Sequence, residues 1–352
     1  MDGLIAEYAP HKGTIAMYPF RNDIWRSDAK YMQKYVCGLV DVISKYEKVY
    51  FFCDPRFINK LKKQYVHNPN VEIISAVYDD IWARDIGPTF VSVRKQIYCV
   101  DWIFNAWGGL KEGSYFPWDK DDAFASFSSH FFNVECNRAS IVVEGGGIIT
   151  DGLGTIFTTQ SVLLNRNRNP FKKKSYVEEQ LLNATGASRV VWLKQGLALD
   201  ETNGHIDNVL SFASPTDVCL AWTDNKKDPN YSRLRAIESI LENLTNINGE
   251  RYSIHHIPMP PSLYMTAEES RGLCKANSID RNEGDLLPAS YLNFYFVNGA
   301  VLIPSFGCET DDIAKKRFQE IFTDREVVQI YSREPLLGGG GIHCILHEVP
   351  EF

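Results

Sequence analysis

Hydrophobic residues along the chain gather in short runs that alternate with longer amphipathic segments. Runs rich in β-branched and aromatic residues predict strands at 48–53, 71–77, 97–104, 139–143, 155–159, 189–193, 209–214, 217–222, 291–297, 300–304 and 326–330. Apolar positions at helical spacing predict helices at 29–46, 121–132, 175–186, 231–244 and 311–322. We therefore predict an α/β fold. Because no Gly/Ser-rich or Pro-rich linker divides the chain, we expect one domain over residues 1–352.

Polar stretches that contain glycine interrupt this pattern at wide intervals. They are WARDIGP at 82–88, EGGG at 144–147, NGHIDN at 203–208, YLNFYFVNGA at 291–300 and GGGGIHC at 338–344. A cyclic repeat that brings corresponding strand ends to one centre would produce such spacing. A doubly wound sheet would also mix helices and strands, but no GxGxxG sequence follows the first strand.

The charge balance favours a cationic ligand over an anionic one. The 352-residue chain is 44% hydrophobic and 23% charged, with a formal net charge of −7. This acidity argues against nucleic acid or an anionic membrane as a partner. The basic run NRNRNPFKKK at 165–174 could contact anions, but we expect a solvated loop that leads into the next helix.

Cysteine usage and the N-terminal sequence predict a cytoplasmic protein. The eight cysteines show no CxxC spacing, so we expect reduced thiols in a cytosol-like compartment. The N-terminus lacks the basic start and apolar run of a signal peptide. The longest apolar candidate for a membrane span is interrupted by Asn298 and Gly299.

Cys344 is the cysteine with the most unusual setting. Four glycines at 338–341 precede it closely, and glycine lets a backbone pass near a ligand. A thiol in this position can act as a nucleophile once a base or a cation favours the thiolate. A buried cysteine after a turn is the alternative. We expect His343 to point away from Cys344, because successive residues of a strand face opposite sides.

His205 is the better partner for this thiol. Asp207 follows it by two positions, so on a strand both side chains would share one face. A histidine beside a carboxylate can transfer protons near neutral pH. One alternative is that His205 and Asp207 are two ligands of a metal site, but no other part of the sequence shows matching ligand spacing. Hydrogen bonds to a local turn after Asn203 and Gly204 are the other.

Two further carboxylates stand beside turns. Asp85 follows Trp82 by three positions, and a carboxylate with a tryptophan face suits a planar cation; a surface ion pair above a buried tryptophan is the alternative. Glu144 ends an apolar strand, as either a functional group in a cleft or a turn residue. Together with Asp207, these carboxylates could clamp a guanidinium, whose charge would stabilise the Cys344 thiolate.

Long segments of the chain resemble the agmatine deiminase (agmatine iminohydrolase) family of the guanidino-group-modifying, or pentein, superfamily, which also holds the bacterial-type peptidylarginine deiminases. The resemblance spans nearly the whole chain. It is carried by WARDIGPTF, FNAWGGLKEGSYFPWDKDD, EGGGI, DETNGHIDN, ASYLNFYFVNGAVLIPSFG and GGGGIHC. It implies a five-bladed α/β propeller of ββαβ-type repeats with pseudo-fivefold symmetry around a central substrate channel.

The same resemblance implies roles for individual residues. Cys344 matches a nucleophile that attacks the guanidinium carbon and forms a covalent thiouronium intermediate. His205 matches the acid and base that protonates departing ammonia and then activates water, and Glu144 matches the carboxylate that orients it. Asp85 and Asp207 match the pair that binds the guanidinium nitrogens. Further side chains expected around the substrate are Trp82, Trp107, Tyr115, Trp118, Glu201 and Asp200, the last two near its distal amine.

The implied reaction is the hydrolysis of agmatine to N-carbamoylputrescine and ammonia, without a metal or cofactor. We expect a homo-oligomer, the usual state of metabolic enzymes. Gly341 stands where the family commonly has asparagine, and Leu346-His347-Glu348 replace Thr-Gln-Gln; these differences bear on substrate identity more than on reaction type. The alternatives are a deiminase for peptidyl-arginine or another guanidine, a non-catalytic guanidine binder, and a Cys–His amidase. An amidase is disfavoured because three carboxylates would repel the oxyanion that forms during its reaction.

Overall fold

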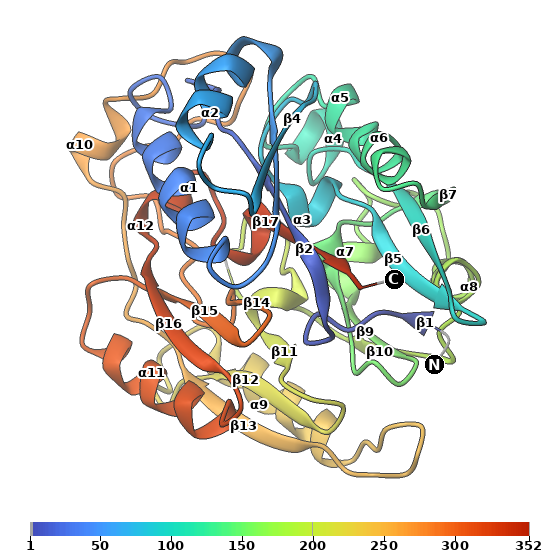
Figure 1. The fold of residues 1–352 in the computed structure, drawn as a ribbon. Coiled ribbons are helices and arrows are strands. Elements are labelled where there is room, and N and C mark those ends of the chain that lie inside the picture. Colours follow the sequence, from blue (N-terminus) through green and yellow to red (C-terminus); the bar gives the residue numbers. More distant parts are fainter. Residues whose placement is uncertain (1–2, 199, 352) are drawn as a thin grey trace.

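Figure 1 shows the protein as a computed structural model that describes residues 3–198 and 200–351. The strands of these described residues form five separate sheets. The first holds β17 (Leu346–Pro350), β2 (His11–Met17), β3 (Val49–Cys53) and β4 (Val71–Ser75), and the second holds β1 (Gly3–Leu4), β5 (Thr89–Val93), β6 (Gln96–Ile103) and β7 (Glu135–Val142). The third holds β8 (Ile148–Thr150), β9 (Thr155–Thr159) and β10 (Arg189–Leu193), the fourth β11 (Leu210–Phe212), β12 (Asp217–Trp222) and β13 (Ser253–Pro258), and the fifth β14 (Tyr295–Val297), β15 (Ala300–Ser305) and β16 (Glu326–Tyr331).

Each sheet repeats one local pattern. The antiparallel pairs are β17–β2, β5–β6, β8–β9, β11–β12 and β14–β15. The second strand of each pair has a parallel neighbour, namely β3, β7, β10, β13 or β16. Parallel strands require a crossover connection. Helices supply these crossovers: α1 (Lys30–Ile43), α4 (Gly109–Glu112), α5 (Asp119–Asp122), α6 (Phe124–Phe131), α7 (Gln160–Leu163), α8 (Lys174–Thr185), α9 (Tyr231–Glu242) and α11 (Thr310–Ile321).

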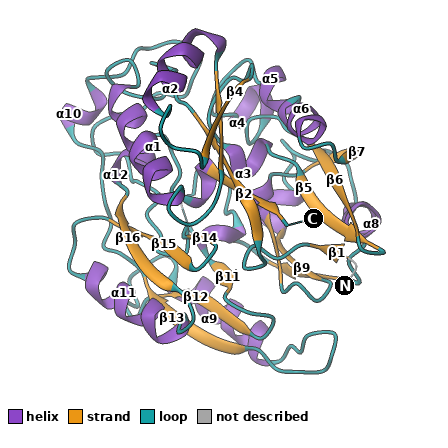
Figure 2. Cartoon of the chain, viewed as in Figure 1, coloured by secondary structure: helices purple, strands orange, loops and turns teal. Residues whose placement is uncertain are grey.

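The longer crossover helices bury one apolar face against the sheets. In α1 the buried residues are Met32, Val36, Leu39, Val40 and Ile43, which recur at the three- and four-residue spacing of one helix face. Figure 2 shows α1, α9 and α11 at the periphery of the molecule. Across the described ranges, every helix is too short or too polar to traverse a lipid bilayer.

The α/β fold and most predicted elements are confirmed, with two kinds of difference. The predicted helix at 121–132 is divided into α5 and α6. Several strands were not predicted, namely β1, β2, β5, β8, β13 and β17. Strand β17 reads LHEVP and is buried throughout. Its histidine and glutamate contact groups from distant segments, so the local apolar pattern could not reveal it.

Residues 5–10 join β1 to β2. Apart from this link, the described part of the chain passes from one sheet to the next through five connections, which we call the sheet junctions: residues 76–88, 143–147, 194–209, 259–294 and 332–345. Each polar stretch noted in the sequence overlaps one of them. Short helical turns lie on these junctions, namely α3 (Ala83–Ile86), α10 (Ala267–Ser270), α12 (Arg333–Leu337) and the 3-10 turns Gly145–Gly147, Ile206–Asn208 and His343–Ile345. Helix α2 (Ile58–Gln64) and the 3-10 turn Pro55–Phe57 instead connect β3 to β4. The sheet junctions therefore carry the candidate catalytic residues.

Candidate active site

Gly146 marks the point at which three sheet junctions meet. A Cβ atom on Gly146 would lie 2.8 Å from Asp207 Oδ2, 2.8 Å from His205 Nδ1 and 3.0 Å from Asp85 Oδ1. These separations are closer than packed atoms normally approach. Only a residue without a side chain lets the two carboxylates and the imidazole surround this point, which explains one glycine of the EGGG stretch.

Asp85 is fixed through both of its carboxylate oxygens. It lies on α3 and is buried. Trp107 Nε1 donates to Oδ2 at 2.8 Å, and the Gly146 backbone N–H donates to Oδ1 at 2.8 Å. Burial raises the pKa of Asp85, and the negative charges of Asp207 and Glu144 add to the increase, although His205 opposes it.

Glu144 forms a fully buried ion pair with Arg168. The Arg168 Nε donates to Glu144 Oε1 at 2.9 Å, and its Nη2 donates to the Thr202 carbonyl at 3.0 Å. Burial alone would raise the pKa of Glu144, but Arg168 and His205 outweigh it and hold the value at about 2. Arg168 belongs to the basic run at 165–174, which leads into α8 as predicted, but the expectation of a solvated loop does not hold for Arg168, which is buried.

His205 is surrounded by carboxylates. Its Nε2 lies 3.5 Å from Glu144 Oε2, and its Nδ1 lies 3.9 Å from Asp85 Oδ1. Burial would lower the pKa of His205, but the charges of Asp85, Glu144 and Asp207 raise it to about 9, so the ring is an imidazolium at neutral pH. His205 and Asp207 lie not on a strand but at the 3-10 turn Ile206–Asn208, and both are buried there.

Cys344 faces Asp207. The Cys344 Sγ lies 3.9 Å from Asp207 Oδ2, which also accepts a hydrogen bond from His343 Nδ1 at 2.9 Å. The other ring nitrogen of His343 lies 2.9 Å from the Glu7 carboxylate. Burial, Asp207 and Asp85 raise the pKa of Cys344 well above its usual range. His343 and Cys344 lie on a 3-10 turn and not on a strand. The expectation that His343 points away from Cys344 was therefore wrong, because both side chains contact Asp207.

Asp207 retains an unused acceptor. Its Oδ1 is buried and receives no hydrogen bond from any described residue. A buried carboxylate oxygen without a donor is energetically costly. The oxygen is therefore available to a ligand that carries N–H groups and positive charge.

Asn293 is a residue of this cluster to which the sequence pattern assigned no role. It lies on the junction before β14, inside the YLNFYFVNGA stretch. Its Nδ2 lies 3.2 Å from Cys344 Sγ, and its Oδ1 accepts a hydrogen bond from the His343 backbone N–H at 3.0 Å. An asparagine within the predicted strand at 291–297 was the available signal. Its contacts with residues about fifty positions away could not be read from the local sequence.

A small cavity opens onto this cluster, and four predicted substrate-binding residues line it: Trp82, Asp85, Trp107 and Glu201. Cys344, Gly338 and Gly339 complete part of the same lining. Arg281 holds Glu201 in a two-pronged ion pair, with N–O distances of 2.8 and 2.9 Å, and donates to the Gly338 carbonyl at 2.7 Å. Arg281 had no predicted role, and its charge compensates that of Glu201.

The remaining predicted binding residues lie outside that lining. Asp200 accepts from the Thr202 backbone N–H at 2.9 Å and from Asn208 Nδ2 at 3.3 Å. Trp118 packs edge-on against Phe116 with ring centroids 5.5 Å apart. Tyr115 donates its hydroxyl to Asp121.

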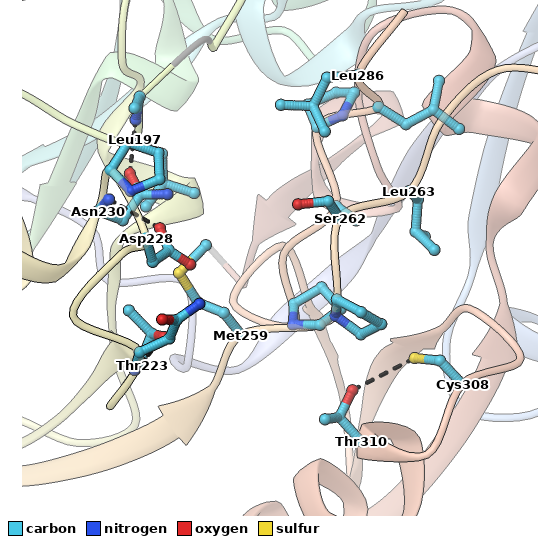
Figure 3. Close-up of a pocket in the computed structure, with 18 of the residues that line it drawn as sticks. Leu197, Thr223, Asp228, Asn230, Met259, Ser262, Leu263, Leu286, Cys308 and Thr310 are labelled. Atoms are coloured by element: carbon cyan, nitrogen blue, oxygen red, sulfur yellow. Dashed lines mark hydrogen bonds between the residues drawn. The ribbon is translucent and has the colours of Figure 1, made fainter. Parts of the chain in front are cut away.

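Asp200 instead lines a separate cavity of about 880 Å³. Figure 3 shows this cavity between Asn230 and Met259 on one side and Ser262, Leu286 and Cys308 on the other. Cys344 does not belong to its lining. Size therefore does not identify the candidate site; the convergence of chemically active side chains does.

The small cavity is lined by the Cys344 thiol and the Asp85 carboxylate. The adjoining cluster adds the protonated imidazole of His205 and the carboxylates of Asp207 and Glu144. This arrangement suits nucleophilic attack on an amidine carbon with proton transfer to a leaving nitrogen. Over residues 3–198 and 200–351, no group of three or more His, Cys, Asp or Glu side chains is arranged to hold a metal ion.

Comparison with known proteins gives one consistent result. The profile of the Porphyromonas-type peptidyl-arginine deiminase family matches residues 3–350. A candidate agmatine deiminase of Mycoplasma capricolum is 41% identical over 345 residues, 98% of this chain and 94% of the relative, and one of Listeria monocytogenes is 40% identical over 98% and 95%. The structure of the agmatine deiminase of Enterococcus faecalis superposes with a TM-score of 0.94 at 32% identity, covering 99% of this chain and 96% of that one.

Proposed function

Because the chain belongs to the Porphyromonas-type peptidyl-arginine deiminase family, we propose that it is a hydrolase that converts agmatine and water into N-carbamoylputrescine and ammonia. Relatives of about 40% identity over the whole chain are named for this activity, and so is the similar Enterococcus structure. The predicted membership of a guanidine-modifying family is thus confirmed, and the substrate is our proposal.

The observation that carries the proposal is the free carboxylate oxygen beside the thiol. Asp207 Oδ1 has no donor among the described residues, while Oδ2 of the same group lies 3.9 Å from Cys344 Sγ. A guanidinium bound to Asp207 and Asp85 would satisfy these acceptors. It would also bring its central carbon next to the sulfur.

The bound cation starts the reaction. Its charge lowers the pKa of the Cys344 thiol, which loses its proton to solvent. The thiolate attacks the guanidinium carbon, and the protonated His205 gives its proton to the departing ammonia. The product of this half-reaction is a thiouronium group on Cys344.

Hydrolysis completes the cycle. His205, now neutral, takes a proton from a water molecule that attacks the thiouronium carbon. The C–S bond then breaks, N-carbamoylputrescine leaves, and Cys344 is restored. Glu144 holds the imidazole through the 3.5 Å contact at Nε2, which supports a role in orienting His205.

Ammonia release from agmatine tests the proposal. Cys344→Ala should reduce turnover by more than about a thousandfold, as expected for a missing nucleophile. The exposed Cys274 provides the matched control, and Cys274→Ala should keep wild-type turnover. Substantial turnover by Cys344→Ala, or none by the wild-type protein, would overturn the proposal.

The alternative substrate is peptidyl-arginine or another guanidine. The ion pair of Glu201 with Arg281 favours this alternative, because it reduces the negative charge available to the distal amine of agmatine. The ranking of agmatine, free arginine and a peptide with C-terminal arginine by kcat/KM decides between the substrates. A clear preference for either arginine compound would refute agmatine as the substrate.

The finer architecture belongs to the same proposal. Five sheets with one repeated strand pattern support a five-bladed α/β propeller, in which the sheet junctions converge on a central channel. A single domain, a cytoplasmic location and a homo-oligomeric state remain predictions.

A further inference from the structure

Two cysteines outside the candidate active site face each other across neighbouring strands. Cys99 on β6 is the direct register partner of Cys136 on β7, and the two strands run parallel. Residues opposite each other in a sheet point their side chains to the same face. Helix α6 packs on both strands (Figure 1). Cys99 is buried in the core on this face, and Cys136 is half-buried against the same core.

The spacing of the strands suits a covalent bond between these two thiols. Paired strands lie about 4.8 Å apart, and the Cα atoms of a disulfide lie about 4.4 to 6.8 Å apart. The thiols of Cys99 and Cys136 already make a hydrogen bond to each other. Joining the two sulfur atoms therefore requires little movement of the backbone.

The surroundings give the two cysteines different reactivities. The hydrogen bond from Cys99 lowers the pKa of Cys136, although burial opposes it. Ser129 and Arg138 lower this pKa further, against the charge of Asp101. The same hydrogen bond, together with burial, raises the pKa of Cys99. Cys136 is also the more exposed of the two. An accessible thiolate beside a second, resolving thiol is typical of redox-sensitive cysteines.

We propose that Cys99 and Cys136 form a redox modification site, at which a peroxide converts the two facing thiols into a reversible disulfide. The Cys136 thiolate attacks one oxygen of the peroxide, the O–O bond breaks, and hydroxide leaves and takes a proton from solvent. Cys136 is then a sulfenic acid. Cys99 attacks the Cys136 sulfur, its thiol proton passes to the departing hydroxide, and an S–S bond and water form. This chemistry does not depend on the reaction proposed for Cys344.

The disulfide would fasten the edge strand of the second sheet. Strand β7 lies at that edge, and most of its residues are exposed or half-buried. The chain between the two cysteines holds Trp107, whose indole donates to Asp85 in the candidate active site. A bond between β6 and β7 closes the base of this segment, so β7 should separate from β6 less often.

Oxidation of the native full-length protein tests the site. The protein is treated with hydrogen peroxide without reductant, its free thiols are blocked with N-ethylmaleimide, and its peptides are analysed by mass spectrometry. The peptides that contain Cys99 and Cys136 should appear joined, lighter by two hydrogen atoms than the separate pair, and dithiothreitol should release them. Cys53 stands opposite Ser75 in the same kind of parallel register, so it should stay unlinked in the same digest.

Two single substitutions separate the steps of the reaction. Cys99→Ser removes the resolving thiol, so Cys136 should remain a sulfenic acid that dimedone labels. Cys136→Ser removes the thiolate that reacts first, so neither the disulfide nor a dimedone label at Cys99 should form. Cys274→Ala, at an exposed position, should leave disulfide formation unchanged. Circular dichroism checks that each variant is folded.

Hydrogen exchange measures the effect on the strand. The amides of β7 should exchange roughly tenfold more slowly in the oxidised protein than in the reduced protein, and peroxide should cause no such change in Cys99→Ser. If wild-type protein gives no joined Cys99–Cys136 peptide, or joins Cys136 to another cysteine, the modification site is refuted. If the disulfide forms but the exchange of β7 is unchanged, the fastening of this strand is refuted.

Discussion

The buried charges of the site are balanced residue by residue. Glu144 meets Arg168 and His205, and Asp207 meets His343. Each of these groups would be costly alone in a dry interior. The balance leaves the acceptor Asp207 Oδ1 free, which is the feature a cationic substrate needs.

Removal of Arg168 should expose the cost of this burial. Arg168→Met leaves Glu144 without its closest cation, so the free energy of unfolding should fall by about 3 to 5 kcal/mol, measured by urea denaturation. The exposed pair of Arg317 with Glu320, at 3.1 Å, provides the control. Arg317→Met should cost less than about 1 kcal/mol. Equal decreases in the free energy of unfolding of the two variants would contradict the high cost of leaving Glu144 buried without a cation.

At the scale of elements, short turns rather than strands carry the reacting groups. Asp85 lies on the four-residue helix α3, and His205, Asp207 and Cys344 lie on or beside 3-10 turns. In a strand, neighbouring side chains face opposite sides. In a 3-10 turn, adjacent residues such as His343 and Cys344 can both reach one carboxylate.

The turn at Gly145–Gly147 should tolerate no added methyl group. Gly146→Ala would push apart Asp207, His205 and Asp85, and such displacement should lower turnover at least about a hundredfold while the protein stays folded. Gly38 on α1 has open space around it, so Gly38→Ala is the control. It should keep full activity and stabilise the helix by about 0.5 to 1 kcal/mol. Near-normal activity of Gly146→Ala would contradict this account of the turn.

At the scale of the whole molecule, both ends of the chain complete the site. Strand β17, which directly follows Cys344, pairs with β2 near the N-terminus, and Glu7 contacts His343. Figure 1 shows the two chain ends in the same region of the molecule. The turn that carries Cys344 is therefore held in place by contacts with the first segment of the chain.

This closure predicts one cooperative unfolding transition. Pairing of β17 with β2 links the ends of the chain, so loss of one sheet should destabilise the others. Tryptophan fluorescence and far-ultraviolet circular dichroism should give coincident urea transitions, together with the accessibility of Cys344 to a thiol reagent. A separate early transition in any of the three signals would argue against a single domain.

Local sequence could specify much of the fold and the identity of the candidate site residues. The apolar runs of β3 and β9 and the stripe on α1 were readable because strand and helix formation depend on neighbours a few positions apart. Cys344, His205 and Asp85 were proposed in the same way, since each stands beside glycine or a polar turn.

The tertiary structure alone decided the partners and the charge states. Arg168 lies in a run that we expected to be a solvated loop, Asn293 lies in a predicted strand, and Arg281 had no local signal. Their contacts join segments 24, 51 and 80 positions apart, and no local pattern encodes such a pairing. The protonation of His205 depends on burial and three converging carboxylates, which exist only once the junctions have come together.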